Sequence, residues 1–199
     1  MTRVPGVVLA GGLSRRMGGG DKTLLAMGGK PILAHVLDRL SPQAHPVAIN
    51  ANGDEERFAR FGLPVIADGV TGLPGPLAGI LEAMRFARQH GAEAVLTVPA
   101  DTPFLPTDLA QRLTEARAEN GIAMAYSADR VHPVCALWPT TIAEALHRFL
   151  VEEQGRKILH FADRVGYRTV AFDNGADPFF NVNTPDDLEA ASQRLCVDG

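Results

Sequence analysis

The stretch that decides the fold lies near the N-terminus, where residues 4–22 read VPGVVLAGGLSRRMGGGDK. Its first part, Val4–Leu9, is a short apolar run followed by a turn signal, which is typical of a strand buried on both faces. Two glycines, Gly11 and Gly12, follow almost at once and let the backbone turn sharply and approach a ligand closely. The stretch therefore predicts a buried first strand that leads into a ligand-binding loop.

The loop after this strand concentrates positive charge. Arg15, Arg16 and Lys22 place three cations within eight residues of a chain whose net charge is −4. Backbone amides of a glycine-rich loop, together with a few cations, form a cradle for polyphosphate. The loop is not a Walker A motif, because Asp21 stands where a glycine must precede the lysine, and it lacks the G-x-G-x-x-G spacing of dinucleotide sites. Phosphate binding is favoured over the alternative, a surface loop with solvated charges.

The rest of the chain alternates strand and helix patterns. Further strands are expected at Pro46–Asn50, Pro64–Ala67, Ala94–Val98, Ile122–Tyr126, Val134–Trp138 and Thr169–Phe172. Helices are expected at about residues 31–41, 54–61, 76–90, 107–119 and 140–153, and a last one from near Pro185, with Thr107 and Thr184 as N-caps. This alternation predicts a mainly parallel sheet covered by helices on both faces, with ligands bound beyond the carboxyl ends of its strands.

Composition limits the classes of function. The 199 residues are 46% apolar and 21% charged, which is ordinary for a globular chain and favours one domain. A net charge of −4 argues against general nucleic-acid binding, and no apolar run is long enough for a signal peptide or a membrane span. The two cysteines, Cys135 and Cys196, match no metal-ligand or redox spacing. We expect a cytoplasmic protein that binds neither nucleic acid nor membrane.

Polar residues follow several of the predicted strands. Asn50 ends the second strand, and its amide can read a base edge or a ribose, although an N-cap or a turn is the alternative. Asp68 follows the third strand, where an aspartate by itself is more often a turn residue. Gly75 and Gly79 mark the start of the clearest helix, whose free N–H groups and positive dipole end suit a ligand. These glycines leave room for a planar base against the backbone.

A second group of candidates lies further along the chain. Asp101 follows the fourth strand and is the best single ligand for magnesium, which prefers hard oxygens; a turn-forming aspartate is the alternative. Asn181 and Asn183 stand at i and i+2 of an extended segment and point to the same side, unless they only cap the last helix. Arg156, beside a glycine, fits a solvated helix end as well as an acceptor contact. A lone histidine such as His132 is usually structural.

Four motifs together resemble a known family. The loop LAGG at 9–12 with its following Ser14, Arg16-Met17-Gly18 and Asp21-Lys22 is similar to the signature of molybdenum cofactor guanylyltransferases, which belong to the wider nucleotidyltransferases. The segments GPLAG at 75–79, ADTP at 100–103 and NVNTP at 181–185 match the same family in order and spacing. The resemblance runs from Val7 to Leu188, and its one noted departure is Ala100, where the family has a cysteine.

The resemblance implies a three-layer α/β/α, Rossmann-like fold with a mainly parallel mixed sheet, of the nucleotide-diphospho-sugar transferase type. It implies a single domain with a nucleotide-binding half at about 1–106 and an acceptor-binding half at about 107–199. The implied reaction transfers GMP from GTP to the terminal phosphate of molybdenum-molybdopterin and releases pyrophosphate. Transient contacts with cofactor-delivery proteins or molybdoenzymes are compatible with this reaction.

The resemblance also assigns residues. Those implied to bind the nucleotide are Leu9, Ala10, Gly11, Gly12, Lys22, Asn50, Asp68, Gly75, Gly79 and Asp101. Those implied to bind the acceptor are Arg156, Asn181 and Asn183. The implied catalytic residues are Lys22, Arg16 and Asp101, and Asp101 is the ligand of Mg²⁺, with Mn²⁺ as an alternative ion.

Other functions stay open at this stage. The nearest are cytidylyl transfer to the same acceptor and nucleotidyl transfer to a sugar phosphate, against which Gly12 and the paired asparagines argue. A nucleotide-binding module without catalysis is a further alternative, although such a module is expected to have lost part of the set Arg16, Lys22 and Asp101.

Overall fold

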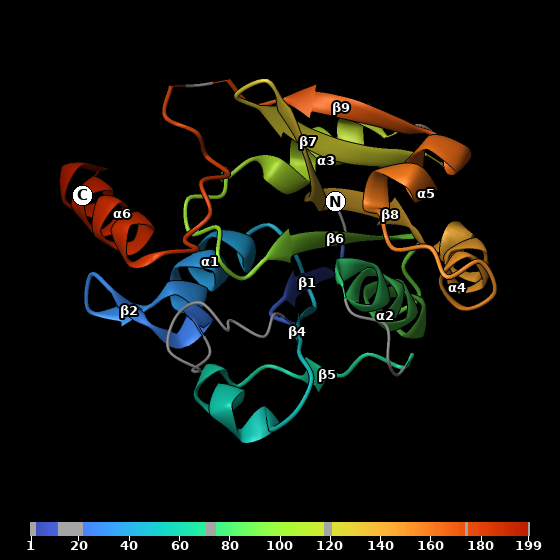
Figure 1. Ribbon diagram of the computed structural model, residues 1–199, viewed down its shortest axis with the longest axis horizontal. Coiled ribbons are helices and arrows are strands. Elements are labelled where there is room, and N and C mark those ends of the chain that lie inside the picture. The colour runs from blue at the N-terminus through green and yellow to red at the C-terminus, as the bar shows by residue number, and fades with distance from the viewer. Residues whose placement is uncertain (1–2, 12–21, 71–74, 118–120, 174, 199) are drawn as a thin grey trace.

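A computed structural model describes residues 3–11, 22–70, 75–117, 121–173 and 175–198, with side chains described as far as Cys196. Its centre is a seven-stranded sheet (Figure 1). The strands are β1 (Gly6–Leu9), β4 (Val47–Asn50), β5 (Val65–Ile66), β6 (Ala94–Pro99), β7 (Ile122–Ser127), β8 (Arg130–Pro139) and β9 (Tyr167–Ala171). They lie in the order β5-β4-β1-β6-β8-β7-β9, and among them β8 alone runs antiparallel to its neighbours. The predicted mainly parallel mixed sheet is confirmed.

Helices cover both faces of this sheet and complete the three layers. Helices α1 (Ile32–Leu40) and α3 (Leu109–Ala116) share one hydrophobic core with the sheet. Helices α2 (Pro76–Gln89), α4 (Ala143–Val151) and α5 (Ile158–Val165) share a second core on the other face. The first strand shows why both faces are apolar, because Val8 packs into the first core and Val7 into the second, each with 0% exposure.

A third, smaller core lies beside the sheet. The short strands β2 (Ala26–Met27) and β3 (Lys30–Pro31) form a hairpin that follows the 3₁₀ helix η1 (Lys22–Leu24). This hairpin packs against the last helix, α6 (Pro185–Asp198). The buried members of this core are Met27, Ile32, Phe104, Val182 and Ala191. It holds together two segments that are distant in sequence, the one that begins at Lys22 and the one that precedes α6.

The ends of the predicted helices are partly confirmed. In α2, Pro76 takes the first helical position and Gly91 follows the helix with a φ of 68°, as expected. Thr184 caps α6, since its hydroxyl accepts from the Asp187 N–H at 3.1 Å while the Asp187 carboxylate accepts from the Thr184 N–H. Thr107 does not cap its helix, because α3 begins one residue later with Asp108 at the N-cap.

Other elements differ from expectation. Residues Glu55–Phe61 form a 3₁₀ helix, η2, rather than an α-helix, and this short element is closed by Gly62 at a φ of 61°. The strand expected at Val134–Trp138 begins earlier, at Arg130, because β8 forms a hairpin with β7. The region expected as helix 140–153 is a 3₁₀ turn, η3 (Thr140–Ile142), followed by α4, and α5 was not expected. In the described part of the chain, no helix has the length and apolar character needed to cross a membrane.

Candidate functional site

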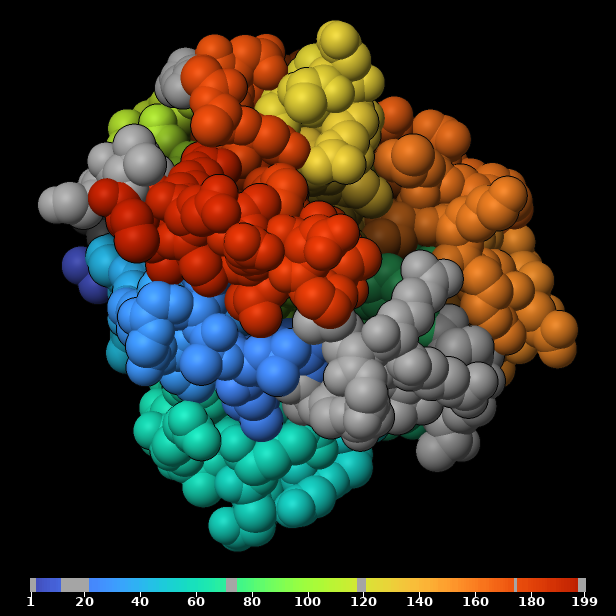
Figure 2. Space-filling model, turned by 60° about the vertical axis from the view of Figure 1, so that its left-hand side comes forward, coloured from blue at the N-terminus to red at the C-terminus, as the bar shows by residue number. Residues whose placement is uncertain are grey.

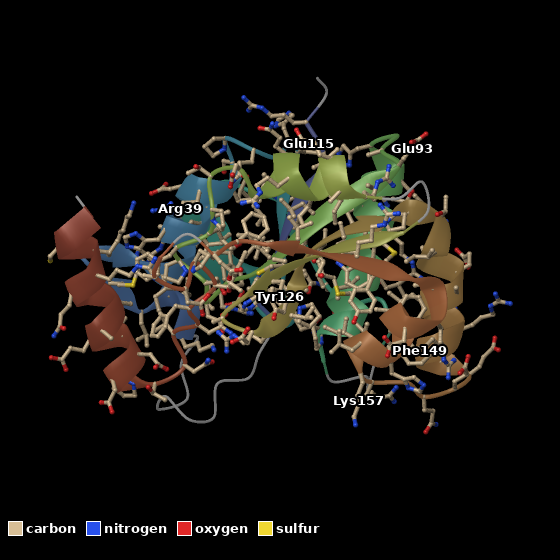
Figure 3. All side chains as sticks on the ribbon, turned by 90° about the horizontal axis from the view of Figure 1, so that it is seen from above. Arg39, Glu93, Glu115, Tyr126, Phe149 and Lys157 are labelled. Atoms are coloured by element: carbon tan, nitrogen blue, oxygen red, sulfur yellow. The ribbon has the colours of Figure 1, made fainter. Side chains whose placement is uncertain are left out.

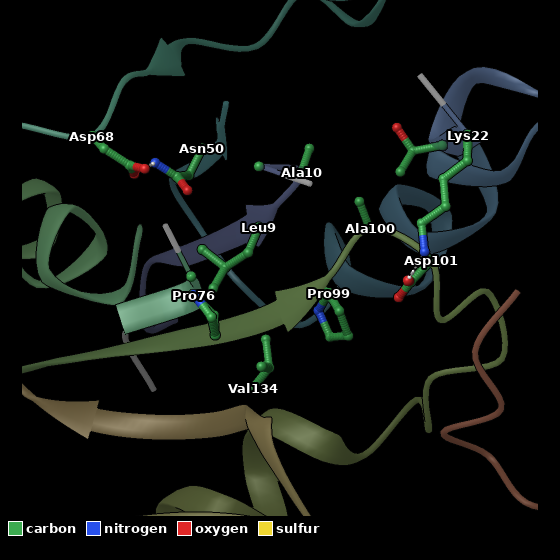
Figure 4. A pocket seen from close by; sticks show the side chains of 13 residues that line it. Leu9, Ala10, Lys22, Asn50, Asp68, Pro76, Pro99, Ala100, Asp101 and Val134 are labelled. Carbon is green, nitrogen blue, oxygen red and sulfur yellow. Dashed lines mark hydrogen bonds and ion pairs between the residues drawn. The ribbon is translucent and has the colours of Figure 1, made fainter. Parts of the chain in front are cut away.

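A pocket opens at the carboxyl ends of the central parallel strands, where the sequence places its motifs. The residues that line it are Leu9, Ala10, Gly11, Lys22, Thr23, Asn50, Asp68, Gly75, Pro76, Pro99, Ala100, Asp101 and Val134. They come from the ends of β1, β4 and β6, the start of α2, the 3₁₀ helix η1 and strand β8. Figure 4 shows two polar pairs on either side of the end of β1, Asn50 with Asp68 and Lys22 with Asp101.

The first polar pair is part of a fixed network. Asn50 is 3% exposed, and its amide nitrogen donates to Asp68 Oδ1 at 2.9 Å and to the Ile66 carbonyl at 3.0 Å. Asn52 holds Asp68 from the other side, because its Nδ2 donates to Asp68 Oδ2 at 2.7 Å and its Oδ1 accepts from the Asp68 N–H at 2.9 Å. The pairing of β4 with β5 brings these residues together. The orientation of the Asn50 carboxamide is therefore determined, with its oxygen turned away from Asp68.

Gly79 explains where that oxygen points. This glycine lies in the first turns of α2, and a Cβ there would overlap Asn50 Oδ1. The Cβ position of Gly11 is 3.8 Å from the same oxygen. The missing side chain of Gly79 thus makes room for Asn50, and Gly79 does not itself line the pocket. Its predicted contact with the nucleotide remains a prediction.

The start of α2 lies at the pocket as predicted. Gly75 precedes the helix with a φ of 127°, a conformation that favours glycine, and no side chain of the described residues caps the helix there. Pro76 at the first position has no N–H to leave unpaired. The amides of the next residues stay available to a ligand, and the dipole of α2 adds positive potential at this edge.

The second polar pair joins three distant parts of the chain. Lys22 Nζ lies 2.5 Å from Asp101 Oδ2 and donates to Asn183 Oδ1 at 2.6 Å. Only 17% of the lysine side chain and 16% of the aspartate side chain are exposed, so solvent screens this ion pair weakly. The structure brings Lys22, Asp101 and Asn183 together, while their chemical roles remain predictions.

The segment before α6 is docked on the residues that follow β6. The Val182 N–H donates to the Asp101 carbonyl at 2.9 Å, and the Thr102 hydroxyl donates to Asn181 Oδ1 at 2.7 Å. Val182 is buried while Asn181 and Asn183 are exposed, so the two asparagines face the same side as predicted. Figure 2 shows this red C-terminal region seated between the blue N-terminal residues and the yellow β7–β8 hairpin.

The structure also locates the candidates that do not join this cluster. Gly12 and Arg16 lie outside the described residues. Arg156 is exposed in the connection between α4 and α5 and does not line the pocket. Its guanidinium donates to the carbonyls of Leu150 and Gly155, at 3.3 and 2.9 Å, which matches the helix-end alternative. Seen from above, the neighbouring Lys157 lies toward the side of the molecule opposite α6 (Figure 3).

Two residues of the network carried no assignment from sequence. Thr102 donates to Asn181, and Asn52 holds Asp68 with two hydrogen bonds. For Asn52 the local signal was its place two residues after Asn50, since residues i and i+2 of an extended segment face the same side. For Thr102 the only local signal was its place next to Asp101. The partner of Thr102 is 79 residues away in the sequence and the partner of Asn52 is 16 residues away, so no local pattern reveals either contact.

The acidic residues near the pocket bear on metal binding. Among the described residues, no group of three or more His, Cys, Asp and Glu side chains is arranged to hold a metal ion. Asp101 supplies a single, partly exposed carboxylate at the pocket. This is enough for magnesium, which is commonly held by one or two carboxylates together with substrate phosphates and water. The Asp101 carboxylate therefore fits a magnesium ion whose other ligands are the phosphates of a bound nucleotide and water.

The sheet order, the loop after β1 and the polar strand ends together define a nucleotide-binding α/β protein of the nucleotidyltransferase type. The comparison with protein families is specific: the chain belongs to the MobA-like NTP transferase family, whose domain model matches residues 6–165. Relatives from Mesorhizobium japonicum and Rhodopseudomonas palustris, both named molybdenum cofactor guanylyltransferase, are each 51% identical to it. The alignments cover 96% of both chains in the first case, and 97% of this chain and 94% of the relative in the second.

Solved structures agree with this membership. The molybdopterin-guanine dinucleotide biosynthesis protein A from Archaeoglobus fulgidus superposes with a TM-score of 0.79 at 26% identity, over 98% of this chain and all of that one. A CMP:2-keto-3-deoxy-manno-octonic acid synthetase complexed with CTP superposes with a TM-score of 0.75 at 16% identity, which shows a shared fold only. The expected nucleotide-diphospho-sugar transferase type of fold is confirmed.

Proposed function

We propose that the protein transfers GMP from GTP to the terminal phosphate of molybdenum-molybdopterin, forming the guanine dinucleotide cofactor and releasing pyrophosphate. The relatives named molybdenum cofactor guanylyltransferase support this reaction at 51% identity over nearly the full chain. The observation in the structure that carries the proposal is the meeting of Lys22, Asp101 and Asn183. It joins the nucleotide pocket to the segment proposed to bind the acceptor.

The proposed chemistry is an in-line displacement. An oxygen of the acceptor's terminal phosphate forms a bond to the α-phosphorus of GTP, and the bond from that phosphorus to the bridging oxygen of pyrophosphate breaks. The acceptor oxygen is already anionic near neutral pH, so the reaction needs no strong general base. The protein's task is to align two anionic groups and to stabilise the charge that develops on the leaving pyrophosphate.

The residues of the pocket suit these tasks. Lys22, largely shielded from solvent, would contact the phosphates of GTP, and Arg16 of the glycine-rich loop completes the proposed catalytic set. Asp101 would hold Mg²⁺, or Mn²⁺ in its place, and the bound ion would supply Lewis-acid stabilisation of the phosphate oxygens. In the structure Lys22 is paired with Asp101 Oδ2. With substrates bound, Asp101 would pair with the metal ion and Lys22 with a phosphate, so two ion pairs would replace one.

The proposed nucleotide contacts lie on the other side of β1. Asn50 and Asp68 would bind the base and ribose together with the backbone of Leu9, Ala10 and Gly11. Gly12, Gly75 and Gly79 would let the nucleotide approach the backbone closely. Asn181 and Asn183 would bind the acceptor, with Arg156 retained as a more distant proposed contact.

The test is the identity of the product. Purified protein is incubated with magnesium, molybdopterin and GTP, CTP or UTP, and the products are analysed by mass spectrometry while pyrophosphate release is followed. We expect a guanine dinucleotide and pyrophosphate with GTP, and much less product with the other nucleotides. A preference for CTP would reassign the protein to cytidylyl transfer, and nucleotide binding without any pyrophosphate release would favour a non-catalytic module.

A further inference from the structure

A polar cluster outside the pocket connects the β7–β8 hairpin to the segment before α6. Ser127 and His132 are buried, with 2% and 8% exposure, and Asp177 is partly buried. Ser127 Oγ lies 2.9 Å from His132 Nε2 and 2.8 Å from Asp177 Oδ1. None of the three lines the pocket, and the proposed reaction does not use them.

The chemistry of these groups determines which atom donates to which. Burial by itself would raise the pKa of Asp177, but hydrogen bonds from the Phe179 N–H and the Ser127 hydroxyl, with the charges of His132 and Arg130, outweigh it and lower the pKa. An ionised carboxylate only accepts, so the single hydroxyl proton of Ser127 goes to Asp177. His132 must then donate its Nε2 proton to Ser127 Oγ. The cluster is a one-directional chain from His132 through Ser127 to Asp177.

This order excludes hydrolytic catalysis by the three residues. A serine nucleophile needs a histidine that accepts its proton and an oxygen that a substrate can reach. Here Ser127 gives its proton to the carboxylate instead, and its side chain is buried. The cluster therefore acts on structure rather than on a substrate.

The structure that it holds is the segment 177–183. Asp177 Oδ1 also accepts from the Phe179 N–H at 2.9 Å, and Asp177 Oδ2 accepts from Arg130 at 2.9 Å. The ring of Phe179 packs on His132, with centroids 4.6 Å apart, and is 0% exposed. Two and four residues after Phe179, Asn181 and Asn183 make their contacts with Thr102 and Lys22. The segment thus runs from the cluster to Lys22, which lines the pocket, although Asn181 and Asn183 do not line it themselves.

We infer that the His132–Ser127–Asp177 chain is a positioning device that sets Asn181 and Asn183 for the acceptor. This inference rests on the proposed function, because it takes these asparagines as the acceptor contacts. Asn181 and Asn183 belong to no helix or strand, so their placement depends on the backbone bond and burial of Val182 between them and on side-chain anchors at the two ends of the segment. At one end the anchors are Thr102 and Lys22, and at the other they are Ser127, Arg130 and His132.

The test separates the two substrates. Ser127→Ala removes the middle of the chain, and we expect KM for molybdopterin to rise roughly tenfold, the factor carried by one or two buried hydrogen bonds. The dissociation constant of GTP, measured by calorimetry, should stay unchanged, because Asn50 and Asp68 belong to a separate network. His132→Gln keeps an amide donor for Ser127 and should retain near wild-type KM, whereas His132→Ala should behave like Ser127→Ala. Thr169→Ala, which removes an exposed hydroxyl in β9 and, like Ser127→Ala, changes no charge, is the matched control.

The outcomes are distinguishable. Wild-type protein that forms no dinucleotide would defeat the proposed function, whereas active variants with unchanged KM for both substrates would overturn the positioning role. Equal rises for both substrates would also overturn it, since a general loss of structure explains them. Because Ser127→Ala leaves a buried histidine without its acceptor and can unfold the chain, the tautomer of His132 in the wild-type protein provides a second test. Long-range ¹⁵N–¹H NMR should find the proton on Nε2, and a proton on Nδ1 alone would contradict the chain.

Discussion

The two sides of the proposed site are built in different ways. On the nucleotide side, Asn50 ends a parallel strand and pairs in register with Leu9 of β1 and Ile66 of β5. Its position therefore follows from the sheet itself. On the acceptor side, Asn181 and Asn183 stand in a segment without regular structure, which is docked by side-chain hydrogen bonds, one backbone hydrogen bond and the burial of Val182.

This difference has energetic consequences. Strand ends are stabilised by a ladder of backbone hydrogen bonds and two hydrophobic cores, so the loss of one side chain leaves their backbone in place. The acceptor segment depends on fewer contacts, each worth about 0.5–1.5 kcal/mol. We expect mutations on the nucleotide side to act locally and mutations on the acceptor side to shift the segment as a unit.

The largest effect is expected where the two sides meet. Asp101→Asn keeps the shape of the side chain but removes the charge that faces Lys22, and turnover should fall by about 10²–10³-fold, as when a preorganised transition-state contact is removed. The variants Asp101→Asn, Lys22→Met and their combination are compared by steady-state turnover at saturating GTP and magnesium. Because groups that act as a unit are not additive, the double variant should be no slower than the slower single variant.

The control for this pair is Asp108→Asn, an equal charge change at the exposed N-cap of α3. It should leave turnover unaltered. Wild-type turnover of Asp101→Asn would remove both the metal assignment and the view that the two sides meet at this residue.

The next effect is expected at Gly79. In most helix interiors Gly→Ala stabilises by about 0.5–1 kcal/mol, but here the new Cβ would overlap Asn50 Oδ1 and displace the Asn50 carboxamide. We expect GTP affinity to fall about tenfold, the equivalent of about 1.4 kcal/mol. Calorimetry with GTP measures the affinity, and thermal unfolding measures the stability.

The matched control removes the overlap by truncating Asn50 as well. In Gly79→Ala/Asn50→Ala the overlapping atoms are gone, so the helix should recover stability while GTP affinity stays as low as in Asn50→Ala alone. If Gly79→Ala binds GTP as tightly as the wild type, Asn50 does not need its observed orientation to bind the nucleotide.

Smaller effects, each on a different substrate, are expected from the replacement of Asn52 and of Asn183. Asn52→Ala frees one face of Asp68 and should weaken GTP binding about fivefold, from about 1 kcal/mol of lost hydrogen bonding, with KM for molybdopterin unchanged. Asn183→Ala should do the reverse, raising KM for molybdopterin while leaving GTP binding almost unaltered. If both variants weaken both substrates equally, the two sides are not independent.

The same contrast explains what the sequence could predict. The strand ends with Asn50, Asp68 and Asp101 were located correctly, because apolar runs followed by polar residues are local signals and parallel strands bring their carboxyl ends to one edge. Lys22 and Asn183, 161 residues apart, were each singled out by a family motif, but their contact was not predicted. No periodicity in either segment encodes their contact.

The missed elements have a physical reason in common. The β2–β3 hairpin has two residues in each strand, and its stability comes from packing against α6 in the third core. Helix α5 is also short for a helix, with eight residues, and it buries Phe161 and Ala162 against the second core. Elements of this length are marginal alone, so tertiary packing rather than local propensity determines them. The interpretation of His132 as structural stays a prediction; its bond to Ser127 is local, but Asp177, the next member of the chain, lies 45 residues from His132 and could not be inferred.

The smallest effect concerns pH and the anchor of the acceptor segment. Burial, with the nearby charge of Arg130, lowers the pKa of His132 below its ordinary value of 6.5. Between the folded and unfolded pKa values the unfolded chain therefore binds more protons, so the free energy of unfolding falls as pH decreases through about 6.5. Asp177, whose folded pKa is also lowered, adds a similar loss only below its ordinary value of 3.8.

Denaturant unfolding at pH 7.5, 6.0 and 5.0 isolates the histidine. The wild type should lose stability over this range, and His132→Gln, which keeps the donor to Ser127 but does not titrate, should lose less. The two proteins differ at no other residue, so the difference between their pH curves reports on residue 132. The loss should also appear in the acceptor segment first, because protonated His132 places a buried charge beside Arg130. Parallel pH curves for the two proteins would mean that His132 is accommodated in its charged form and does not anchor the segment as a neutral donor.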